Sequence, residues 1–406
     1  MSKNQFLCSL DIGTTNTRAI VGEFDRDGQI NVVGIGQSRS SGLKRGTIID
    51  IDATVKGISE AVEQAERMIG EEIDQVYVGI GGPQTSLLRN RGVVAVQNED
   101  REITDQDIER VMQAAQVLAI PPEREIINIR PITYVVDGYD GIIDPKGMIG
   151  VRLEMEALIV TGKATYVQNI KRCVERADLE VGGIVLKGLS SGMLAMNPDE
   201  RELGCALIDI GGGVTEISIF ENDVLRHFVS IPQGGDLVTY DLAHGLKVPY
   251  AQAEQIKIVY GAASPEHAGD GSISIESVGA SRPVDVPAAE LVYYIQPRVE
   301  EIFDYIRTEL IRAGFQQPPT GGVVLTGGAC QLPGLLEIAE SKLTTNVRLY
   351  RPGQVGVADP SFTASTSLLH YVAGVSPVVP QKKPARKGNS RPVFNKIKSL
   401  FSELFG

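Results

Sequence analysis

Three glycine-rich segments constrain the fold of this 406-residue chain more than any other feature. They run from Leu10 to Thr17 (LDIGTTNT), from Ile208 to Thr215 (IDIGGGVT) and from Val324 to Ala329 (VLTGGA). The first two share Asp-Ile-Gly, and a threonine follows six residues after each aspartate. Each begins as an apolar strand, turns on glycine and continues as an alternating strand, which is typical of a hairpin whose backbone N–H groups can face a phosphate. Two such hairpins, one in each half of the chain, predict a duplicated α/β fold that grips one nucleotide from both sides.

In this order and at this spacing, the three segments resemble the two phosphate loops and the adenosine loop of the superfamily of actin, sugar kinases and heat-shock ATPases. The resemblance implies an α/β, actin-like ATPase fold in which two duplicated halves surround a nucleotide cleft. Two better-known nucleotide sites are excluded, because the chain has no G-x-x-x-x-G-K-[ST] motif and no G-x-G-x-x-G motif after its first strand. Ordinary hairpins in an unrelated α/β protein are the alternative.

The same resemblance implies the residues of a nucleotide site. Asp11 and Asp209, at the ends of the inner strands, are expected to face each other and to suit Mg²⁺, which takes few direct protein ligands. Glu254 and Lys257 lie three residues apart on one helix face and match a position that contacts the nucleoside in the superfamily; the alternative is a solvated ion pair. With ATP and Mg²⁺ as expected cofactors, the predicted nucleotide-binding residues are Asp11, Gly13, Thr14, Thr15, Asn16, Asp209, Gly211, Gly212, Gly213, Thr215, Gly235, Glu254, Lys257, Gly327, Gly328 and Ala329.

The stretch before the second hairpin, residues 186–193, departs from the superfamily pattern. Superfamily ATPases usually place a Glu, Gln or Asp there to orient the attacking water, whereas this stretch has no carboxylate or amide and places Lys187 near that position. A general base must reach its water directly or through one relay. The catalytic residue is therefore left unknown, and we expect tight ATP binding with at most slow ATPase activity. Asp11 acting through a water is the runner-up base.

Charge and cysteine usage bear on the compartment and the partners. Four scattered cysteines suggest small buried side chains in a reducing compartment. The sequence shows no signal peptide and no apolar run of the roughly 18 residues that span a membrane, so we expect a cytoplasmic protein. Residues 381–406 carry a net +6, which leaves −18 on the preceding part of a chain whose net charge is −12. The acidic body argues against nucleic acid as a partner, and the basic end suggests an anionic surface.

Hydrophobic periodicity and composition divide the chain into six segments. Helices are expected near 52–70, 105–118, 164–177, 234–261, 289–313 and 364–374, and strands over 5–36 and at 76–80, 93–96, 132–136, 152–160, 182–186 and 321–326. The expected segments are a first-half core (1–83 and 359–376), a small α+β insertion (84–162), a second-half core (163–233 and 316–358), a second-half outer subdomain (234–315), a flexible basic linker (377–392) and a terminal helix (393–406).

The terminal helix carries a single apolar stripe opposite lysine and serine. After Val393, the stripe consists of Phe394, Ile397, Leu400, Phe401, Leu404 and Phe405. At the end of a basic linker this pattern favours a helix lying in a membrane interface. The alternatives are a helix docked on its own body and a helix that binds a partner. One short helix binds lipid only weakly, whereas several on one polymer gain from effective concentration.

Taken together, the features over about residues 5–406 resemble the FtsA family of bacterial cell-division proteins, which carries a distinctive insertion at this place in the chain. The resemblance implies a homopolymer that anchors the tubulin-like FtsZ ring to the cytoplasmic face of the cell membrane at the division site and recruits later division proteins. The FtsZ C-terminal peptide is expected on 234–315, where Arg298 and Arg307 are basic; simple solvated charges are the alternative for both. The absence of tryptophan is a departure from the family's membrane helix. A pilus-assembly-type actin-like ATPase and a soluble sugar or acid kinase are the alternative functions.

Overall fold

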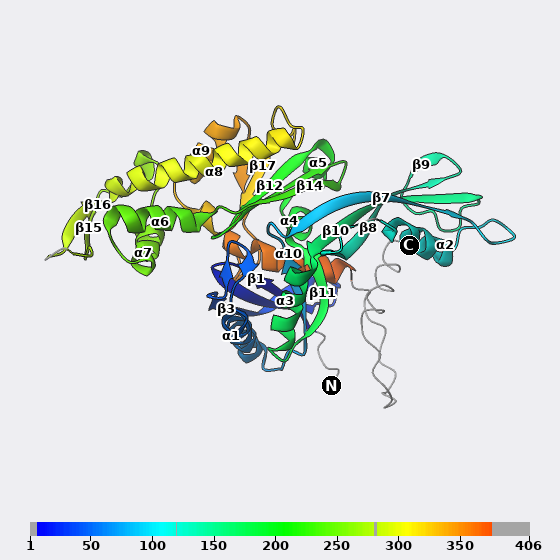
Figure 1. Cartoon of the computed structure of the whole chain (residues 1–406), viewed down its shortest axis with the longest axis horizontal. Coiled ribbons are helices and arrows are strands. Elements are labelled where there is room, and N and C mark those ends of the chain that lie inside the picture. Colours follow the sequence, from blue (N-terminus) through cyan, green and yellow to red (C-terminus); the bar gives the residue numbers. More distant parts are fainter. Residues whose placement is uncertain (1–5, 119, 280–281, 376–406) are drawn as a thin grey trace.

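The computed structural model describes residues 6–118, 120–279 and 282–375, and two five-stranded sheets of identical topology form its body (Figure 1). The first sheet has the order β3-β2-β1-β6-β11 and the second the order β14-β13-β12-β17-β18. In each sheet a meander of three antiparallel strands is followed by two parallel neighbours. The predicted α/β actin-like fold with duplicated halves is confirmed. The strands of the two sheets are β1 (Phe6–Ile12), β2 (Asn16–Phe24), β3 (Ile30–Arg39), β6 (Gln75–Ile80), β11 (Glu180–Leu186), β12 (Cys205–Ile210), β13 (Thr215–Glu221), β14 (Val224–Ile231), β17 (Val323–Thr326) and β18 (Val347–Leu349).

Alternation along β1 determines what each face of the first sheet meets. Leu10 points into a core with α1 (Ile51–Ile69) and α3 (Ala164–Glu175). Ser9 points to the other face, where its hydroxyl donates to the Ser365 carbonyl of α10 (Thr363–Val375) at 2.8 Å. Asp11 shares the face of Ser9, so the strand delivers this carboxylate to the seam between the two halves. The returning helix α10 closes the first half, as periodicity predicts.

One predicted boundary is corrected by the pairing of strands. We expected the second half to open at residue 163, but β11 pairs in parallel with β6 of the first sheet. Helix α3 also packs in the first core, where Val167 and Ile170 are buried beside residues of α1. The chain therefore completes a fifth strand of the first sheet before it crosses to the second half through α4 (Lys187–Ala195). Periodicity identified both elements correctly but carries no information about which sheet edge they join.

The second sheet is covered by helices on one face and meets α4 on the other. Ile208 packs with the helices of the second half, whereas Leu207 packs with Leu189 of α4. Asp209 therefore points toward the seam, as Asp11 does from the first sheet. The hairpin of β15 (Ser272–Ile275) and β16 (Val284–Pro287) lies between α7 and α8 in the chain. The helices of the second half are α5 (Pro198–Leu203), α6 (Gly235–Leu246), α7 (Tyr250–Tyr260), α8 (Val292–Arg312) and α9 (Leu335–Leu343).

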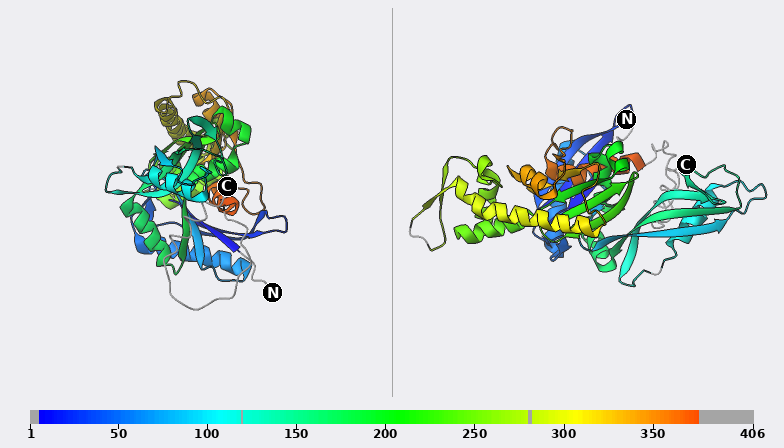
Figure 2. Two further views of the ribbon diagram at one scale, coloured as in Figure 1. Left: turned by 90° about the vertical axis from the view of Figure 1, so that its right-hand side faces the viewer. Right: turned by 90° about the horizontal axis from the view of Figure 1, so that it is seen from above.

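The insertion between the halves forms a four-stranded sheet of order β7-β10-β8-β9 with α2 packed against it. Its elements are β7 (Thr85–Ala95), α2 (Asp105–Gln116), β8 (Arg124–Val136), β9 (Tyr139–Ile142) and β10 (Arg152–Lys163). The predicted cap of α2 is confirmed, because the Asp107 carboxylate accepts hydrogen bonds from the backbone N–H and the hydroxyl of Thr104. The insertion and the β15–β16 hairpin lie at opposite ends of an elongated molecule (Figure 2).

A short ribbon of β4 (Leu43–Lys44) and β5 (Thr47–Ile48) joins β3 to α1. Within the described ranges, none of the helices is both long and apolar enough to cross a lipid bilayer. The predicted basic linker and the predicted membrane helix, including Phe394, Ile397, Leu400, Phe401, Leu404 and Phe405, lie outside the described residues.

Candidate functional site

The two phosphate-type hairpins have the same local geometry. In the first, the backbone N–H of Gly13 donates to the Asn16 carbonyl at 3.1 Å, and in the second Gly211 donates to the Val214 carbonyl at 2.9 Å. Each turn follows an aspartate at the same register position, since Asp11 pairs with Arg18 in one sheet and Asp209 with Glu216 in the other. The duplication therefore extends from topology to individual backbone hydrogen bonds.

The two turns approach each other so closely that their glycines have no room for a side chain. A Cβ at Gly212 would lie 1.9 Å from Thr15 Oγ1, and a Cβ at Gly213 would lie 2.7 Å from Thr14 Cγ2. The Thr14 hydroxyl accepts a hydrogen bond from the Gly46 backbone N–H at 3.1 Å, which fixes the first turn against the β4–β5 ribbon. The glycine run of the second hairpin thus makes room for the side chains of Thr14 and Thr15 as well as allowing the turn.

The third segment brings another glycine against the second hairpin. Gly327 has φ +94°, a conformation that L side chains rarely adopt, and a Cβ there would lie 2.3 Å from Asp209 Oδ1. Just before it, the Thr326 hydroxyl donates to the Thr363 hydroxyl of α10 at 2.7 Å. The three segments that define the sequence pattern therefore converge on one place between the halves.

They enclose a cleft of about 630 Å³, a volume within the range of small-molecule sites. The predicted residues that line it are Asp11, Gly13, Thr14, Thr15, Asn16, Asp209, Gly211, Gly212, Gly213, Gly235, Glu254, Lys257, Gly327, Gly328 and Ala329. Thr215 is placed elsewhere: it is fully buried, and its hydroxyl donates to the Gln233 carbonyl at 2.9 Å. Thr215 therefore anchors the loop that leads to α6 and is not exposed to the cleft.

Glu254 and Lys257 form part of the cleft wall and are not the solvated pair of the alternative interpretation. Their ion pair is 2.8 Å long, and the two side chains are 14% and 15% exposed. Lys257 Nζ also donates to the Gly235 carbonyl at 3.1 Å and to the Thr239 hydroxyl at 2.7 Å. These bonds tie α7 to the start of α6, where the Gly235 backbone N–H donates to the Gly211 carbonyl of the second hairpin at 2.9 Å.

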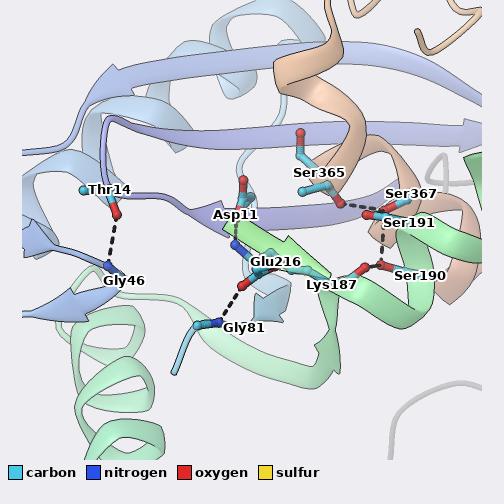
Figure 3. Close-up of polar contacts among 12 residues, drawn as sticks. Asp11, Thr14, Gly46, Gly81, Lys187, Ser190, Ser191, Glu216, Ser365 and Ser367 are labelled. Carbon is cyan, nitrogen blue, oxygen red and sulfur yellow. Dashed lines mark hydrogen bonds and ion pairs between the residues drawn. The ribbon is translucent and has the colours of Figure 1, made fainter. Parts of the chain in front are cut away.

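At the floor of the cleft, carboxylates from both sheets surround one lysine (Figure 3). Lys187, the first residue of α4, places its Nζ 3.4 Å from Asp11 Oδ1. Glu216 is buried on β13, and its Oε1 accepts a hydrogen bond from the Gly82 backbone N–H at 2.5 Å. Burial lowers the pKa of Lys187, but the nearby carboxylates of Asp11 and Glu216 outweigh it and raise that pKa above its usual value. Burial and Glu216 raise the pKa of Asp209 to about 7, although Lys187 opposes the shift.

The floor fits a hydrated cation better than a directly ligated one. Asp11 is 6% exposed, and its Oδ1 has no hydrogen-bond partner among the described residues. Burial is the largest cause of the raised pKa of Asp209, and the carboxylates of Glu216 and Asp11 add to it. No group of three or more metal-ligating side chains is close enough to hold an ion within the described residues. Asp11 and Asp209 thus suit Mg²⁺, which keeps most of its waters and takes few protein oxygens.

Sequence reasoning missed Glu216 and did not include Lys187 among the site residues. The signal for Glu216 is its place in the hairpin: it pairs with Asp209, so it must point to the same face of the sheet. The sequence identifies Lys187 only as a residue that stands near the position of an expected acid or amide. Arg18, the partner of Asp11 in the first hairpin, also lines the cleft and donates to Gln37 Oε1 and to the Ser361 hydroxyl, each at 2.9 Å.

The two basic residues considered on α8, Arg298 and Arg307, have different surroundings. Arg298 bonds Asp241 with its Nε at 2.6 Å and also pairs with Glu301. The Asp241 hydrogen bond raises the pKa of Arg298 above its usual value. Arg307 is exposed. Of the two arginines considered for an acidic peptide, Arg298 is held by carboxylates of its own chain.

Two family models match the chain. The model described as "Cell division protein FtsA" matches residues 206–367, and the model described as "SHS2 domain inserted in FTSA" matches residues 82–161. The second match coincides with the insertion that carries the four-stranded sheet. The insertion is therefore an SHS2 domain.

Similar curated proteins and solved structures agree with these matches. The cell division protein FtsA of Bacillus subtilis (strain 168) is 42% identical over 372 residues, which is 91% of this chain and 84% of the relative. A structure of the PilM-PilN type IV pilus biogenesis complex has a TM-score of 0.64 at 15% identity and covers 91% of this chain and 99% of its own. The structure of MreB 5 of Spiroplasma citri bound to AMPPNP has a TM-score of 0.55 at 13% identity and covers 91% of this chain and 97% of its own. The two structures share the fold, and the identity to the curated relative, together with the family models, shows that this chain belongs to the FtsA family of cell division proteins.

Proposed function

We propose that this chain is an ATP-binding cell-division protein that polymerises and anchors the FtsZ ring to the cytoplasmic face of the membrane through residues 393–406, and recruits later division proteins there. The observation that carries the proposal is the cleft between two matching phosphate-type hairpins in a chain of the FtsA family. The pilus complex has a similar fold at low sequence identity, which does not favour a pilus role or a kinase role for this chain.

The nucleotide part of the proposal rests on the geometry of the cleft. Backbone N–H groups of the two turns supply phosphate contacts, and Gly327 and Gly328 let the backbone pass close to the nucleoside. Asp11 and Asp209 hold hydrated Mg²⁺, which neutralises the phosphates when it is bound. The similar MreB 5 structure is described as bound to AMPPNP, a triphosphate analogue. Glu254 and Lys257 fix the wall on the nucleoside side.

We expect slow ATP hydrolysis because of the residues at the floor of the cleft. Lys187 takes the position where an acid or amide is expected, and it donates protons but accepts none. Glu216 is the additional buried carboxylate there, and its Oε1 is occupied by the Gly82 N–H. This bond holds the Glu216 side chain toward the first half, so we assign it a structural role at the floor. We therefore expect the ATP-bound state to persist long enough to support a polymer.

The membrane part of the proposal rests on the sequence of the tail. Its apolar stripe suits an interfacial helix, and the linker before it is basic. A single such helix binds lipid weakly, so the anchor needs several copies on one polymer. Membrane binding should therefore depend both on the tail and on the nucleotide.

Co-sedimentation with vesicles of phosphatidylglycerol and phosphatidylcholine tests the proposal. The full chain and a chain ending at Pro392 are compared with Mg²⁺ and either ATP or no nucleotide. A full-length variant with Phe401→Ser and Leu404→Ser keeps every charge and separates apolar insertion from electrostatic attraction. We expect pelleting only for the unmodified full chain with ATP. No pelleting of the full chain in either condition would remove the membrane role and bring the pilus-type and kinase functions forward.

A further inference from the structure

Lys187 is a mostly buried cation that lines the cleft. It is the first residue of α4, directly after β11, and its aliphatic chain lies over Gly79 of β6. Gly79 is the neighbour of Asp11 in the β1–β6 register, so the ammonium ends beside the Asp11 carboxylate. The lysine side chain is 16% exposed, which is low for this residue type.

Two glycines provide the space for this arrangement. A Cβ at Gly79 would lie 2.9 Å from Lys187 Cγ, and a Cβ at Gly81 would lie 2.1 Å from Glu216 Oε1. Any larger residue at either position would displace the lysine or the glutamate. The end of β6 is therefore shaped around the buried charges.

The charges at the floor do not balance. Asp11, Asp209 and Glu216 contribute three carboxylates, whereas Lys187 and Arg18 contribute two cations. A nucleoside triphosphate adds a further negative charge for each phosphate group. The Arg18 guanidinium is already held by Gln37 and Ser361. Lys187 is the cation that contacts Asp11, so it is the one placed to attract the phosphate that reaches deepest into the cleft.

The contact between Lys187 and Asp11 leaves the lysine with bonding capacity. At 3.4 Å it is longer than the 2.7–2.9 Å of a strong charge-assisted hydrogen bond. An ammonium has three N–H donors, so it can keep Asp11 and bind a phosphate oxygen as well. The side chain lines the cleft, which gives a ligand access to it.

The position of Lys187 determines which phosphate it meets. The nucleoside end of the cleft is at Gly235 and Lys257, where a Cβ at Gly235 would be 3.6 Å from Lys257 Nζ and 3.3 Å from the Ala329 side chain. Lys187 forms its ion pair instead with Asp11, at the end of the strand that leads into the first hairpin. A nucleotide with its base beside Ala329 points its terminal phosphate toward Lys187.

We propose that Lys187 binds the terminal phosphate of the nucleotide and thereby makes the cleft select the triphosphate over the diphosphate. The inference rests on the proposed nucleotide site. A diphosphate in the same place leaves the lysine paired with Asp11, whereas a triphosphate gains a charge-assisted hydrogen bond. Lys187 is thus the residue through which this protein distinguishes its two nucleotide states.

Calorimetric titration of the full chain with AMPPNP and with ADP, both in Mg²⁺, tests this selectivity. Lys187→Met should weaken AMPPNP binding by about 10- to 100-fold, the range for a hydrogen bond to a charged group, and leave ADP binding nearly unchanged. Lys187→Arg, which keeps the charge, should recover part of the preference. Lys56→Met is the matched control, because Lys56 is 78% exposed on α1.

The outcomes separate this inference from the proposed function. If the unmodified chain binds neither nucleotide, the ATP site itself fails, and the role of Lys187 falls with it. If the unmodified chain binds and Lys187→Met lowers both affinities equally, or neither, Lys187 is only a structural counter-ion. Melting temperatures identify a variant that does not fold; Lys187→Gln, which keeps a polar end, then takes the place of Lys187→Met in the same comparison.

Discussion

The carboxylate of Glu216 accepts a hydrogen bond from the backbone N–H of Gly82 at 2.5 Å. Glu216 belongs to β13 of the second sheet, and Gly82 follows β6 of the first sheet. The bond therefore joins the two halves at the floor of the cleft, beside the carboxylates proposed to hold Mg²⁺. Both halves must keep their present arrangement for the bond to persist.

Removing the Glu216 carboxylate should destabilise the present arrangement of the halves. Glu216→Ala leaves the Gly82 N–H buried without its acceptor, which costs about 1–3 kcal/mol. Glu216→Gln keeps an amide oxygen that can accept the same bond, so its loss should be smaller. Melting temperatures of the nucleotide-free protein measure the difference. Equal melting temperatures for the two variants would show that the bond contributes nothing to stability.

The raised pKa of Asp209 predicts a pH dependence of stability without metal or nucleotide. The pKa is about 7 in the folded protein and about 4 in an unfolded chain. Between these values the folded state holds a proton that the unfolded state has released. The contribution of Asp209 to the free energy of unfolding therefore falls as the pH rises from about 4 to 7, and the loss is complete above 7.

Asp209→Asn removes this titration and serves as the reference. In EDTA, we subtract the melting temperature of the unmodified protein from that of Asp209→Asn at each pH. This difference should be larger at about pH 8 than at about pH 5. Groups that do not interact with Asp209 titrate alike in both proteins and cancel in the comparison. A constant difference across this range would mean that the pKa of Asp209 is not raised.

Gly327 should be indispensable for nucleotide binding. Gly327→Ala adds a methyl group that would lie 2.3 Å from Asp209 Oδ1, at a φ of +94° that alanine rarely adopts. The Asp209 carboxylate must move, so the affinity for ATP should fall by at least about tenfold, a loss of about 1.4 kcal/mol. Gly353→Ala is a matched control, because no described atom beyond its chain neighbours lies within 4 Å of a Cβ there. Unchanged affinity in Gly327→Ala would defeat its assignment to the site.

Much of the fold was predictable because local signals and the duplicated pattern agreed. The end of α1 followed from Gly70, which has the left-handed conformation that ends the helix, and the start of α2 followed from Thr104 and Asp107. The hairpins followed from the repeated Asp-Ile-Gly. The strands of the insertion were predicted too short, since β8 extends from Arg124 to Val136 through two irregularities in its pairing with β10 and through half-buried positions that break the alternation.

The floor of the cleft was harder to predict because its members come from separate elements. The sequence pattern favoured Thr215 as the site residue and not its neighbour Glu216. The Thr215 hydroxyl donates instead to the Gln233 carbonyl. Lys187 departs from the superfamily pattern, and its role depends on its distance to Asp11. Side-chain direction across a hairpin could have identified Glu216. The meeting of α4 with β1 required three-dimensional information.

Deleting residues 393–406 should leave the body of the protein intact and remove its membrane binding. The described residues already bury continuous cores in both halves and in the insertion, and α10 closes the first half with Leu368 and Leu369 fully buried. The melting temperature of the shortened chain should therefore match that of the full chain, and so should its affinity for ATP. A large loss of thermal stability would instead mean that the apolar stripe of the tail packs on the body. A shortened chain that still pellets with anionic vesicles in the presence of ATP would place the membrane contact elsewhere on the protein.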